Sequence, residues 1–350
     1  MHLLLAPPAA RARTGGAVYN RRVAAILEPE GFLSYSIADS GDISRAIGEA
    51  GAAAAGAGDA GAAAGLDSIL LDGLYLDDPD FAAVFERISG VEVGLLLHFM
   101  PSMIDPAARE REDAVIGGSS YFVVPSRYAA TELENRGVDP DRIGVVKPGV
   151  DEQKLARPTP ELFDTGTPRL LTVANFSAVK ELDWLIGPLE QVADLDWRWE
   201  ILGDTKTDPE SYTRFRRRLA GSAIVDRVQV HGSVAEEEVQ QILQRGTVFL
   251  LPTRFEPYGI ALAEALASGV PIVTNRVGGV DEVVRDGEVG YLLERGDEAA
   301  WVGSIRSLLE DSDLLGAFRG NARFYRLELP TWKITARRLE KFLRRVTGAG

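Results

Sequence analysis

The chain has 350 residues, 45% of them hydrophobic, which is enough apolar material for two separate cores. Its formal net charge of −14 argues against general nucleic-acid binding and against broad adsorption to anionic lipid. Cysteine is absent, which excludes a disulfide framework and makes a cytoplasmic location the expectation.

Apolar runs alternate with helical patterns through the first half of the chain. An amphipathic helix is predicted at residues 18–27, and Ser126 is placed as the N-cap of a helix with Ala129, Ala130 and Leu133 on its inner face. Strands are predicted at residues 2–6, 32–37, 68–71, 91–97, 121–124 and 143–146. Strands that alternate with helices predict a parallel sheet.

Several residues of this first half suit a ligand site. Gly15 and Gly16 predict a turn between the first strand and the first helix, where the backbone approaches a ligand closely. Tyr19 and Asn20 follow in the first helical turn. His98 stands at the carboxyl end of a strongly apolar strand, and open α/β sheets bind ligands at such ends. A plain turn and a strand-capping histidine are the alternatives.

Two further segments of the first half receive no function. Residues 48–65 are almost all alanine and glycine, which predicts either a loop or a thin helix. Residues 77–80, Asp-Asp-Pro-Asp, are similar to an acidic metal-binding motif, but Asp-Pro clusters between periodic segments usually form turns. No His, Cys and Asp cluster with metal spacing occurs elsewhere in the sequence, so we predict no required metal.

The second half repeats the alternation after a Pro-Gly-Val-Asp turn at residues 148–151 and a stretch rich in proline and threonine. Lys180 follows its first strand, and a helix is predicted through residues 184–186. Strands are predicted at residues 169–174, 197–202, 228–230, 248–251 and 270–274. The chain closes with an amphipathic helix at residues 332–346, whose apolar side is formed by Ile334, Phe342, Leu343 and Val346.

Residues 250–271 predict a strand, a loop, a helix and the start of another strand. Two prolines in the loop stop regular pairing, and Gly259 permits a tight path into the helix. Glu256 lies in this loop. The unpaired N–H groups near Gly259, Ile260 and Ala261 suit a phosphate or an electron-rich sugar oxygen.

A second carboxylate, Glu264, lies inside the same helix. It shares a helical face with Ala261, Ala265 and Ser268, whose small side chains leave room for a ligand. The alternative is a solvated surface helix that carries ordinary glutamates.

This stretch resembles the signature of retaining nucleotide-sugar glycosyltransferases with the GT-B fold, in particular glycosyltransferase family four. The matching features are Glu256, seven residues and Glu264, within Pro-Thr-Arg-Phe-Glu-Pro-Tyr-Gly-Ile and Glu-Ala-Leu-Ala-Ser-Gly-Val-Pro. The resemblance covers nearly the whole chain and is most specific over residues 170–293. It implies an α/β protein with two Rossmann-like parallel-sheet domains that face each other across a cleft.

The resemblance also implies a division of the chain. Residues 1–150 would form the acceptor-side domain, residues 151–168 a linker, and residues 169–328 the nucleotide-sugar domain. Residues 329–350 would form a helix that packs back onto the first domain.

The resemblance assigns roles in the nucleotide-sugar domain. Glu256 would contact the donor sugar, and Glu264 would hold the ribose hydroxyls of the donor nucleotide. In the family an arginine and a lysine five residues apart grip the donor diphosphate. Lys180 matches the lysine, but Asn175 occupies the arginine position, and asparagine supplies no charge. One cation of the diphosphate clamp is therefore missing.

Further roles follow from the resemblance at five positions. Gly15 and Gly16 would form a glycine-rich loop that faces the donor, and His98 would lie near the donor sugar and the acceptor. His231 and Gly232 would border the nucleobase. We expect no cofactor apart from the donor substrate.

The predicted function is transfer of a hexosyl group, with retained configuration, from a nucleotide-diphosphate sugar to an acceptor hydroxyl. UDP is favoured over GDP, and the acceptor is a lipid, a glycan or a small molecule. The alternatives are a sugar-nucleotide epimerase, a glycoside phosphorylase and a non-catalytic nucleotide-sugar-binding protein.

The sequence also bears on location. No apolar run reaches the length of a membrane span, and residues 1–8 are too short for a signal peptide. The arginines of the last predicted helix leave a peripheral contact with the inner face of the membrane open, although docking of that helix on the first domain is favoured.

Overall fold

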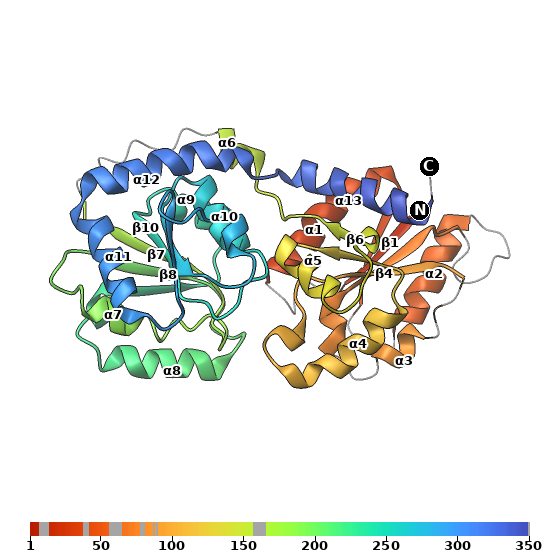
Figure 1. The fold of residues 1–350 in the computed structure, drawn as a ribbon, viewed down its shortest axis with the longest axis horizontal. Helices are drawn as coiled ribbons and strands as arrows, with labels where there is room; N and C mark the ends of the chain where they lie inside the picture. The colour runs from red at the N-terminus through yellow and green to blue at the C-terminus, as the bar shows by residue number, and fades with distance from the viewer. Residues whose placement is uncertain are drawn as a thin grey trace. The chain divides into compact units, whose positions relative to one another are not determined.

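The computed structural model describes residues 1–6, 14–37, 42–55, 65–77, 81–86, 88, 90–156 and 166–348. The chain divides into two compact units (Figure 1), of which the first comprises Met1–Gly149 and Pro330–Gly350 and the second Val150–Leu329. Each unit is built on a six-stranded parallel sheet with helices packed against it. The predicted α/β class with parallel sheets is confirmed.

The sheet of the first unit has the strand order β2-β1-β3-β4-β5-β6. Its strands are β1 His2–Ala6, β2 Phe32–Ser36, β3 Ser68–Asp72, β4 Glu92–Leu96, β5 Tyr121–Val124 and β6 Ile143–Val145. Its helices are α1 Gly15–Leu27, α2 Ile43–Ala55, α3 Phe81–Phe85, α4 Arg109–Gly118, α5 Arg127–Glu134 and α13 Trp332–Thr347.

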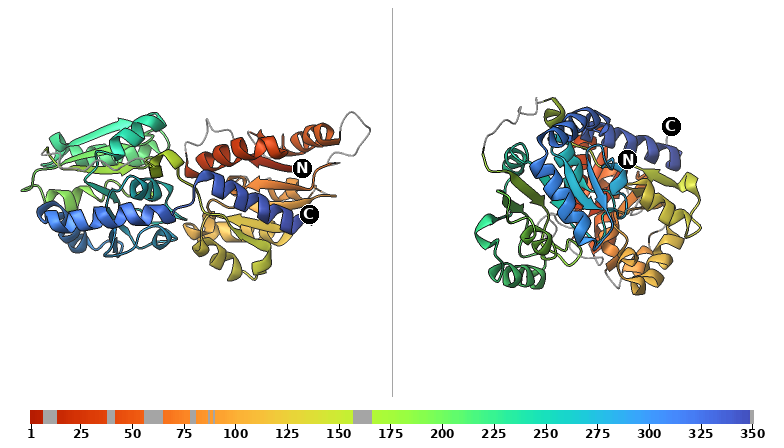
Figure 2. Two further views of the ribbon diagram at one scale, coloured as in Figure 1. Left: turned by 90° about the horizontal axis from the view of Figure 1, so that it is seen from above. Right: turned by 60° about the vertical axis from the view of Figure 1, so that its left-hand side comes forward.

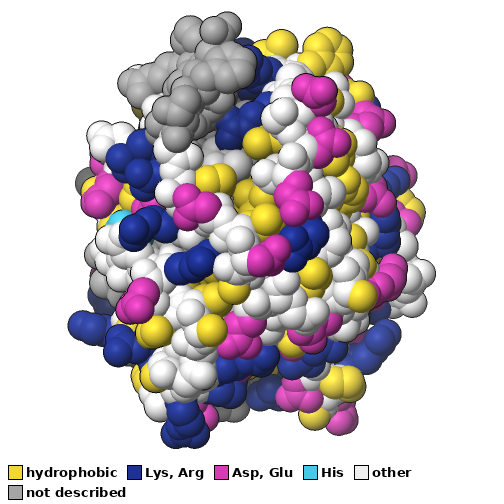
Figure 3. All heavy atoms as spheres, turned by 90° about the vertical axis from the view of Figure 1, so that its left-hand side faces the viewer, with side chains coloured by type: hydrophobic (Ala, Val, Ile, Leu, Met, Phe, Trp, Pro, Cys, Tyr) yellow, Lys and Arg dark blue, Asp and Glu magenta, His cyan; other side chains and the backbone are white. Residues whose placement is uncertain are grey.

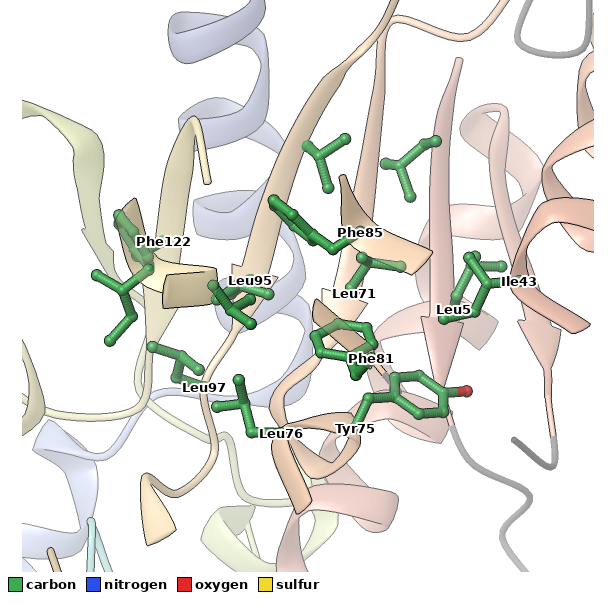
Figure 4. Packing of buried hydrophobic residues seen from close by; sticks show 14 of the residues in the cluster. Leu5, Ile43, Leu71, Tyr75, Leu76, Phe81, Phe85, Leu95, Leu97 and Phe122 are labelled. Atoms are coloured by element: carbon green, nitrogen blue, oxygen red, sulfur yellow. The ribbon is translucent and has the colours of Figure 1, made fainter. Parts of the chain in front are cut away.

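Alternate residues of these strands enter two different cores, because successive side chains of a strand point to opposite faces. On one face, Leu5, Leu71 and Leu95 pack with side chains from α2 and α3, among them Ile43 and Phe81 (Figure 4). On the other face, the intervening strand residues pack against α1 and α13, which lie side by side (Figures 1 and 2). The last helix therefore completes the core of the first unit.

The sheet of the second unit has the order β12-β11-β10-β7-β8-β9. Its strands are β7 Arg169–Val173, β8 Arg198–Leu202, β9 Val228–Gly232, β10 Val248–Leu251, β11 Ile272–Asn275 and β12 Gly290–Leu293. Its helices are α6 Glu152–Ala156, α7 Ile186–Glu190, α8 Pro209–Ala220, α9 Glu236–Leu243, α10 Ile260–Ala267, α11 Glu298–Glu310 and α12 Ser312–Tyr325.

Each sheet contains a topological switch point, where neighbouring strands send the chain in opposite directions. In the first sheet this point lies between β1 and β3, and in the second it lies between β7 and β10. Counted within its own unit, the second sheet has the dinucleotide-binding order 3-2-1-4-5-6. Open α/β sheets bind ligands beyond the carboxyl ends of the strands at such points. The two switch points are therefore where the predicted site residues should gather.

Most local predictions are confirmed, and the cap at Ser126 is one example. Its hydroxyl accepts a hydrogen bond from the backbone N–H of Ala129, and the three predicted inner residues of α5 are buried. The prediction that Ile334 lies on the apolar side of the last helix is wrong, because this residue is 41% exposed. The predicted Phe342, Leu343 and Val346 do pack on this face of α13, together with Trp332, Ala336 and Leu339.

Other differences concern where helices begin and end. Gly15 and Gly16 do not form a separate turn but open α1, with the Thr14 hydroxyl as its N-cap acceptor. The helix that was predicted through residues 184–186 begins only at Ile186. In the Ala-Gly run, helix α2 reaches Ala55, and residues 56–64 lie outside the described part of the chain, as do residues 78–80 of the acidic segment.

Charged side chains of both signs are interspersed on the surface. Figure 3 shows one face on which Lys and Arg side chains alternate with Asp and Glu side chains, with small hydrophobic areas between them. The ion pairs of Arg306 with Asp194 and of Arg285 with Glu328 are examples of such exposed contacts in the second unit. Exposed pairs of this kind contribute little to stability.

Candidate functional site

The switch point of the second sheet brings Lys180 and Glu256 together. Lys180 lies in the loop after β7, and Glu256 lies in the loop after β10, 76 residues further along the chain. The Lys180 ammonium donates to Glu256 Oε2 at 2.5 Å, and the two side chains are 24% and 14% exposed. This partly buried ion pair remains open to solvent and hence to a ligand.

Backbone contacts fix the loops that carry this pair. The backbone N–H of Arg254 donates to the carbonyl of Val179 at 2.7 Å, and the Thr253 hydroxyl donates to the same carbonyl at 3.2 Å. The carbonyl of Glu256 accepts from Gly279 N at 2.9 Å. A Cβ on Gly278 would lie 2.1 Å from that carbonyl oxygen, so only glycine permits this approach.

Glu181, next to Lys180, is a functional candidate that the sequence analysis missed. It has a φ of 47°, and it is the one non-glycine residue with positive φ in the described part of the chain. Its carboxylate accepts two hydrogen bonds from Arg295, at 3.0 and 2.5 Å, and lies 3.9 Å from Arg254 Nε. Left-handed backbone at a non-glycine residue is typical of functional loops. No local sequence pattern signals it.

Asn175, where the resemblance leads us to expect an arginine, stabilises the loop after β8. Its Oδ1 accepts a hydrogen bond from Asp204 N at 2.9 Å, and the carbonyl of Asp204 accepts from Phe176 N at 3.0 Å. A Cβ on Gly203 would lie 1.9 Å from the carbonyl oxygen of Ala174, so the loops after β7 and β8 approach closely. The side chain of Asn175 thus has a structural use, and it brings no charge to the site.

Helix α10 begins beside the Glu256 loop without a side-chain cap. Its N-cap, Gly259, has a φ of 97°, and the first turn contains no acidic residue. Ile260, Ala261 and Glu264 are partly exposed. Ala265, however, is fully buried, so the small residues do not form one ligand-facing surface. The uncapped N–H groups leave the positive end of the helix dipole available to an anion.

His231 and Gly232 lie at the end of β9. His231 Nε2 is 3.0 Å from Glu200 Oε2, and Glu200 also accepts from Arg169 at 2.6 Å. Gly232 has a φ of 73°, and its carbonyl accepts from Gly203 N at 2.9 Å. These contacts fix the orientation of the imidazole ring, and the role of both residues at a nucleobase stays a prediction.

The first unit holds a second group of polar side chains at its own switch point. His98 Nε2 lies 2.8 Å from Asn20 Oδ1, and Asn20 Nδ2 donates to Asp72 Oδ2. Gly16 lies against the His98 ring, whereas Gly15 is exposed. Burial lowers the pKa of His98 below 6.5, and the nearby Asp72 opposes this shift only in part. Asp72 was not predicted, although a polar residue that ends a buried apolar strand is a readable signal.

One further cavity lies away from both switch points. It has a volume of about 200 Å³, lies at the amino ends of β1 and β2, lined by His2 and Phe32 among others, and contains none of the predicted site residues. Within the described ranges, no group of three or more His, Cys, Asp or Glu side chains could hold a metal ion. In the same residues, no helix is both long and apolar enough to cross a membrane.

Comparison with known proteins gives a family for the second unit. Residues 167–311 match the family described as glycosyl transferases group 1. The chain is 29% identical over 225 residues to the D-inositol 3-phosphate glycosyltransferase of Xylanimonas cellulosilytica, an alignment that covers 61% of this chain and 54% of the relative. The chain thus spans about half the length of the curated relatives that it matches.

Solved structures match over the whole chain. Sucrose-phosphate synthase from Thermosynechococcus elongatus aligns with a TM-score of 0.79 at 17% identity, covering 100% of both chains. Anabaena HepE in complex with UDP and glucose aligns with a TM-score of 0.76 at 16% identity, covering 98% of both. At these identities the likeness establishes the fold, which is that of GT-B glycosyltransferases.

Proposed function

We propose that this chain, which carries a group 1 glycosyl transferase domain over residues 167–311, transfers a hexosyl group from a nucleotide-diphosphate sugar to an acceptor hydroxyl. The observation that carries the proposal is the Lys180–Glu256 ion pair at the switch point of the second sheet, beside the uncapped start of α10. A cation, a carboxylate and free N–H donors are the groups that a diphosphate joined to a sugar requires.

Lys180 and the first N–H groups of α10 bind the donor diphosphate in this proposal. The ammonium supplies a full positive charge, and the helix start supplies backbone donors near Ile260 and Ala261. Both stabilise the negative charge that grows on the leaving diphosphate as the sugar departs. Because Asn175 brings no charge, Lys180 carries more of this task than it would beside an arginine.

Glu256 changes its partner when the donor binds. In the free protein its carboxylate accepts from Lys180, and in the complex it accepts from hydroxyls of the donor sugar while Lys180 turns to the diphosphate. Glu264, partly exposed one turn into α10, accepts from the ribose hydroxyls. Carboxylates suit both tasks because they are strong hydrogen-bond acceptors.

The reaction breaks the bond between the anomeric carbon and the diphosphate oxygen and forms a bond to the acceptor oxygen on the same face. The acceptor hydroxyl proton passes to the departing diphosphate. His98 of the first unit binds a substrate hydroxyl, and no protein nucleophile or metal takes part. Support for UDP as the carrier comes from the complexes of HepE with UDP and with UDP-glucose.

The acceptor is proposed to be a hydroxyl of a lipid, a glycan or a small polar molecule. The relatives whose names point to an acceptor are the D-inositol 3-phosphate glycosyltransferases and an N-acetyl-alpha-D-glucosaminyl L-malate synthase. Inositol phosphates and hydroxy acids are therefore the first acceptors to screen.

The first test is thermal unfolding with UDP, GDP, ADP and their sugar conjugates. A ligand at about a hundred times its dissociation constant adds about 2.7 kcal/mol of stability, which raises the melting temperature measurably. We expect the largest shift with UDP or a UDP-sugar. The absence of a shift with every nucleotide would remove the donor site from the second unit.

The second test separates transfer from other chemistry. With the donor that binds, proton NMR of the anomeric region follows product formation in the presence of an acceptor screen. Transfer requires an acceptor and yields a product with the donor configuration. Conversion of the donor alone would indicate an epimerase, and dependence on inorganic phosphate would indicate a phosphorylase.

A further inference from the structure

Three polar side chains form a hydrogen-bonded chain at the switch point of the first sheet. Asp72 ends β3, Asn20 lies in α1, and His98 follows β4. The contacts run from Asp72 through Asn20 to His98, across sequence separations of 52 and 78 residues. Asp72 is fully buried, Asn20 is 8% exposed, and the His98 side chain is 11% exposed. This series of hydrogen bonds therefore leads from the protein interior at Asp72 to the slightly solvent-exposed ring of His98.

The direction of every hydrogen bond in this chain follows from Asp72. Its Oδ1 accepts from Leu74 N at 2.9 Å, and its Oδ2 accepts from Asn20. Because a carboxylate offers acceptors only, Asn20 turns its NH₂ group toward Asp72. The carbonyl oxygen of Asn20 then faces His98 Nε2 at 2.8 Å, so the imidazole carries its proton on Nε2.

Packing around the ring holds this orientation. A Cβ on Gly16 would lie 2.7 Å from His98 Cδ2, so the helix start touches one edge of the ring. The Tyr19 ring meets the imidazole in an edge contact with centroids 5.1 Å apart. His98 Nδ1 has no hydrogen-bond partner within the residues that the structure describes. The ring thus keeps one fixed proton and one unused lone pair.

We propose that Asp72 and Asn20 are positioning residues that hold His98 as the Nε2–H tautomer, so that Nδ1 accepts a hydrogen bond from a hydroxyl of the substrate. This inference rests on the proposed function, since the hydroxyl belongs to a sugar donor or its acceptor. A neutral lone pair selects a hydroxyl and does not attract a phosphate or a carboxylate. The first unit therefore recognises a neutral polar group at this position.

The tautomer is tested directly by NMR of protein labelled with nitrogen-15 in its histidines. The sequence has three histidines, and the spectrum of His98→Gln identifies the signals of His98. We expect wild-type His98 to be protonated on Nε2. A ring protonated on Nδ1 in the wild type would overturn the inference, whatever the activity of the protein.

The substitution Asp72→Asn should reverse the direction of the hydrogen bonds from residue 72 through Asn20 to His98, and it changes the size of the side chain little. Because Leu74 N still requires an oxygen, the new amide nitrogen takes the Oδ2 position and donates to Asn20 Oδ1. Asn20 then presents its NH₂ group to His98 Nε2, and the ring proton moves to Nδ1. Retention of the Nε2–H tautomer in this variant would contradict the assignment. Asn20→Leu, which removes the link, is expected to give a mixture of tautomers.

Kinetics test the positioning role with donor affinity as the reference. In Asp72→Asn we expect kcat/KM for transfer to fall about a hundredfold, while the thermal shift caused by UDP is unchanged. His2→Gln is the matched control, because His2 also bonds a β3 residue, Ser68, outside the site. A reversed tautomer with normal kcat/KM would refute the positioning role. If no nucleotide sugar binds at all, the proposed function fails, and the NMR result still decides the tautomer.

Discussion

Both units gather polar side chains at the switch point of the sheet, but the two groups of side chains differ in chemistry. At the switch point of the first sheet, buried Asp72, Asn20 and His98 form a chain of hydrogen bonds that ends in a neutral imidazole. At the switch point of the second sheet, Lys180 and Glu256 form a partly exposed ion pair next to a left-handed Glu181. Parallel sheets thus supply a common place for a site, and the residues at the strand ends decide what it binds.

The imidazole of His98 and the ammonium of Lys180 differ in exposure as well as in charge, with side chains that are 11% and 24% exposed. Burial lowers the pKa of His98, which favours the neutral imidazole, and a neutral imidazole suits a hydroxyl. The partly exposed ammonium of Lys180 suits a diphosphate.

Lys180→Ala should have the largest effect on turnover. It removes the one lysine of the proposed diphosphate site and leaves Glu256 without its cation, so kcat should fall about 100- to 1,000-fold. Steady-state kinetics with the donor that binds measure this effect. Lys341→Ala, on the exposed side of α13, is the control and should be neutral. Near-normal turnover would remove Lys180 from the mechanism.

Gly278→Ala should displace Glu256 and lower turnover at least tenfold. The added Cβ would lie 2.1 Å from the Glu256 carbonyl oxygen, and φ at this position is 58°. Gly287→Ala is the matched control, because its φ of 73° is similar but no atom lies within 4 Å of an added Cβ. Equal losses of activity in the two variants would show that backbone strain alone is responsible.

Glu256→Gln should separate nucleotide binding from transfer. It removes the carboxylate that competes for Lys180 in the free protein, so the affinity for UDP should rise a few-fold while transfer falls. Calorimetric titration with UDP measures the first effect. Glu237→Gln, at the exposed start of α9, controls for the change in net charge. Weaker UDP binding in Glu256→Gln would contradict the exchange of partners.

Glu181→Gly should change stability little but reduce activity several-fold. Glycine relieves a left-handed conformation that costs about 1–2 kcal/mol, and the lost ion pair with the half-exposed Arg295 contributes about 0.2–1 kcal/mol. Chemical denaturation and kinetics measure the two quantities. Arg295→Ala removes the pair and keeps the strain, so it should be the less stable variant. If Glu181→Gly is instead the less stable of the two variants, the left-handed conformation of Glu181 does not destabilise the folded protein.

The smallest expected effect concerns stability in acid. The pKa of His98 is lowered from 6.5 by burial, so below about pH 6.5 the unfolded chain takes up a proton that the folded chain does not. His98 therefore makes the free energy of unfolding fall as the pH falls from 6.5 toward 5. His98→Gln should give a shallower decline in urea titrations over this range. His2, whose pKa is also lowered, contributes in the same direction in both proteins.

The sequence by itself determined the features that are encoded locally. Buried strands such as β5 and β10 are continuous apolar runs, and Ser126 and Gly259 mark helix starts that the structure contains. Such patterns can be read because a strand or a cap depends on neighbours within a few residues. The parallel α/β architecture follows from their alternation.

Only the tertiary structure decided which of these elements are neighbours. Lys180 meets Glu256 across 76 residues, and Asn20 meets Asp72 across 52, because burial of apolar strands sets β7 beside β10 and β1 beside β3. The exposure of Ile334 and the left-handed Glu181 likewise depend on distant packing. Strand order is a long-range property, since it depends on how all faces are covered at once, and no local period encodes it.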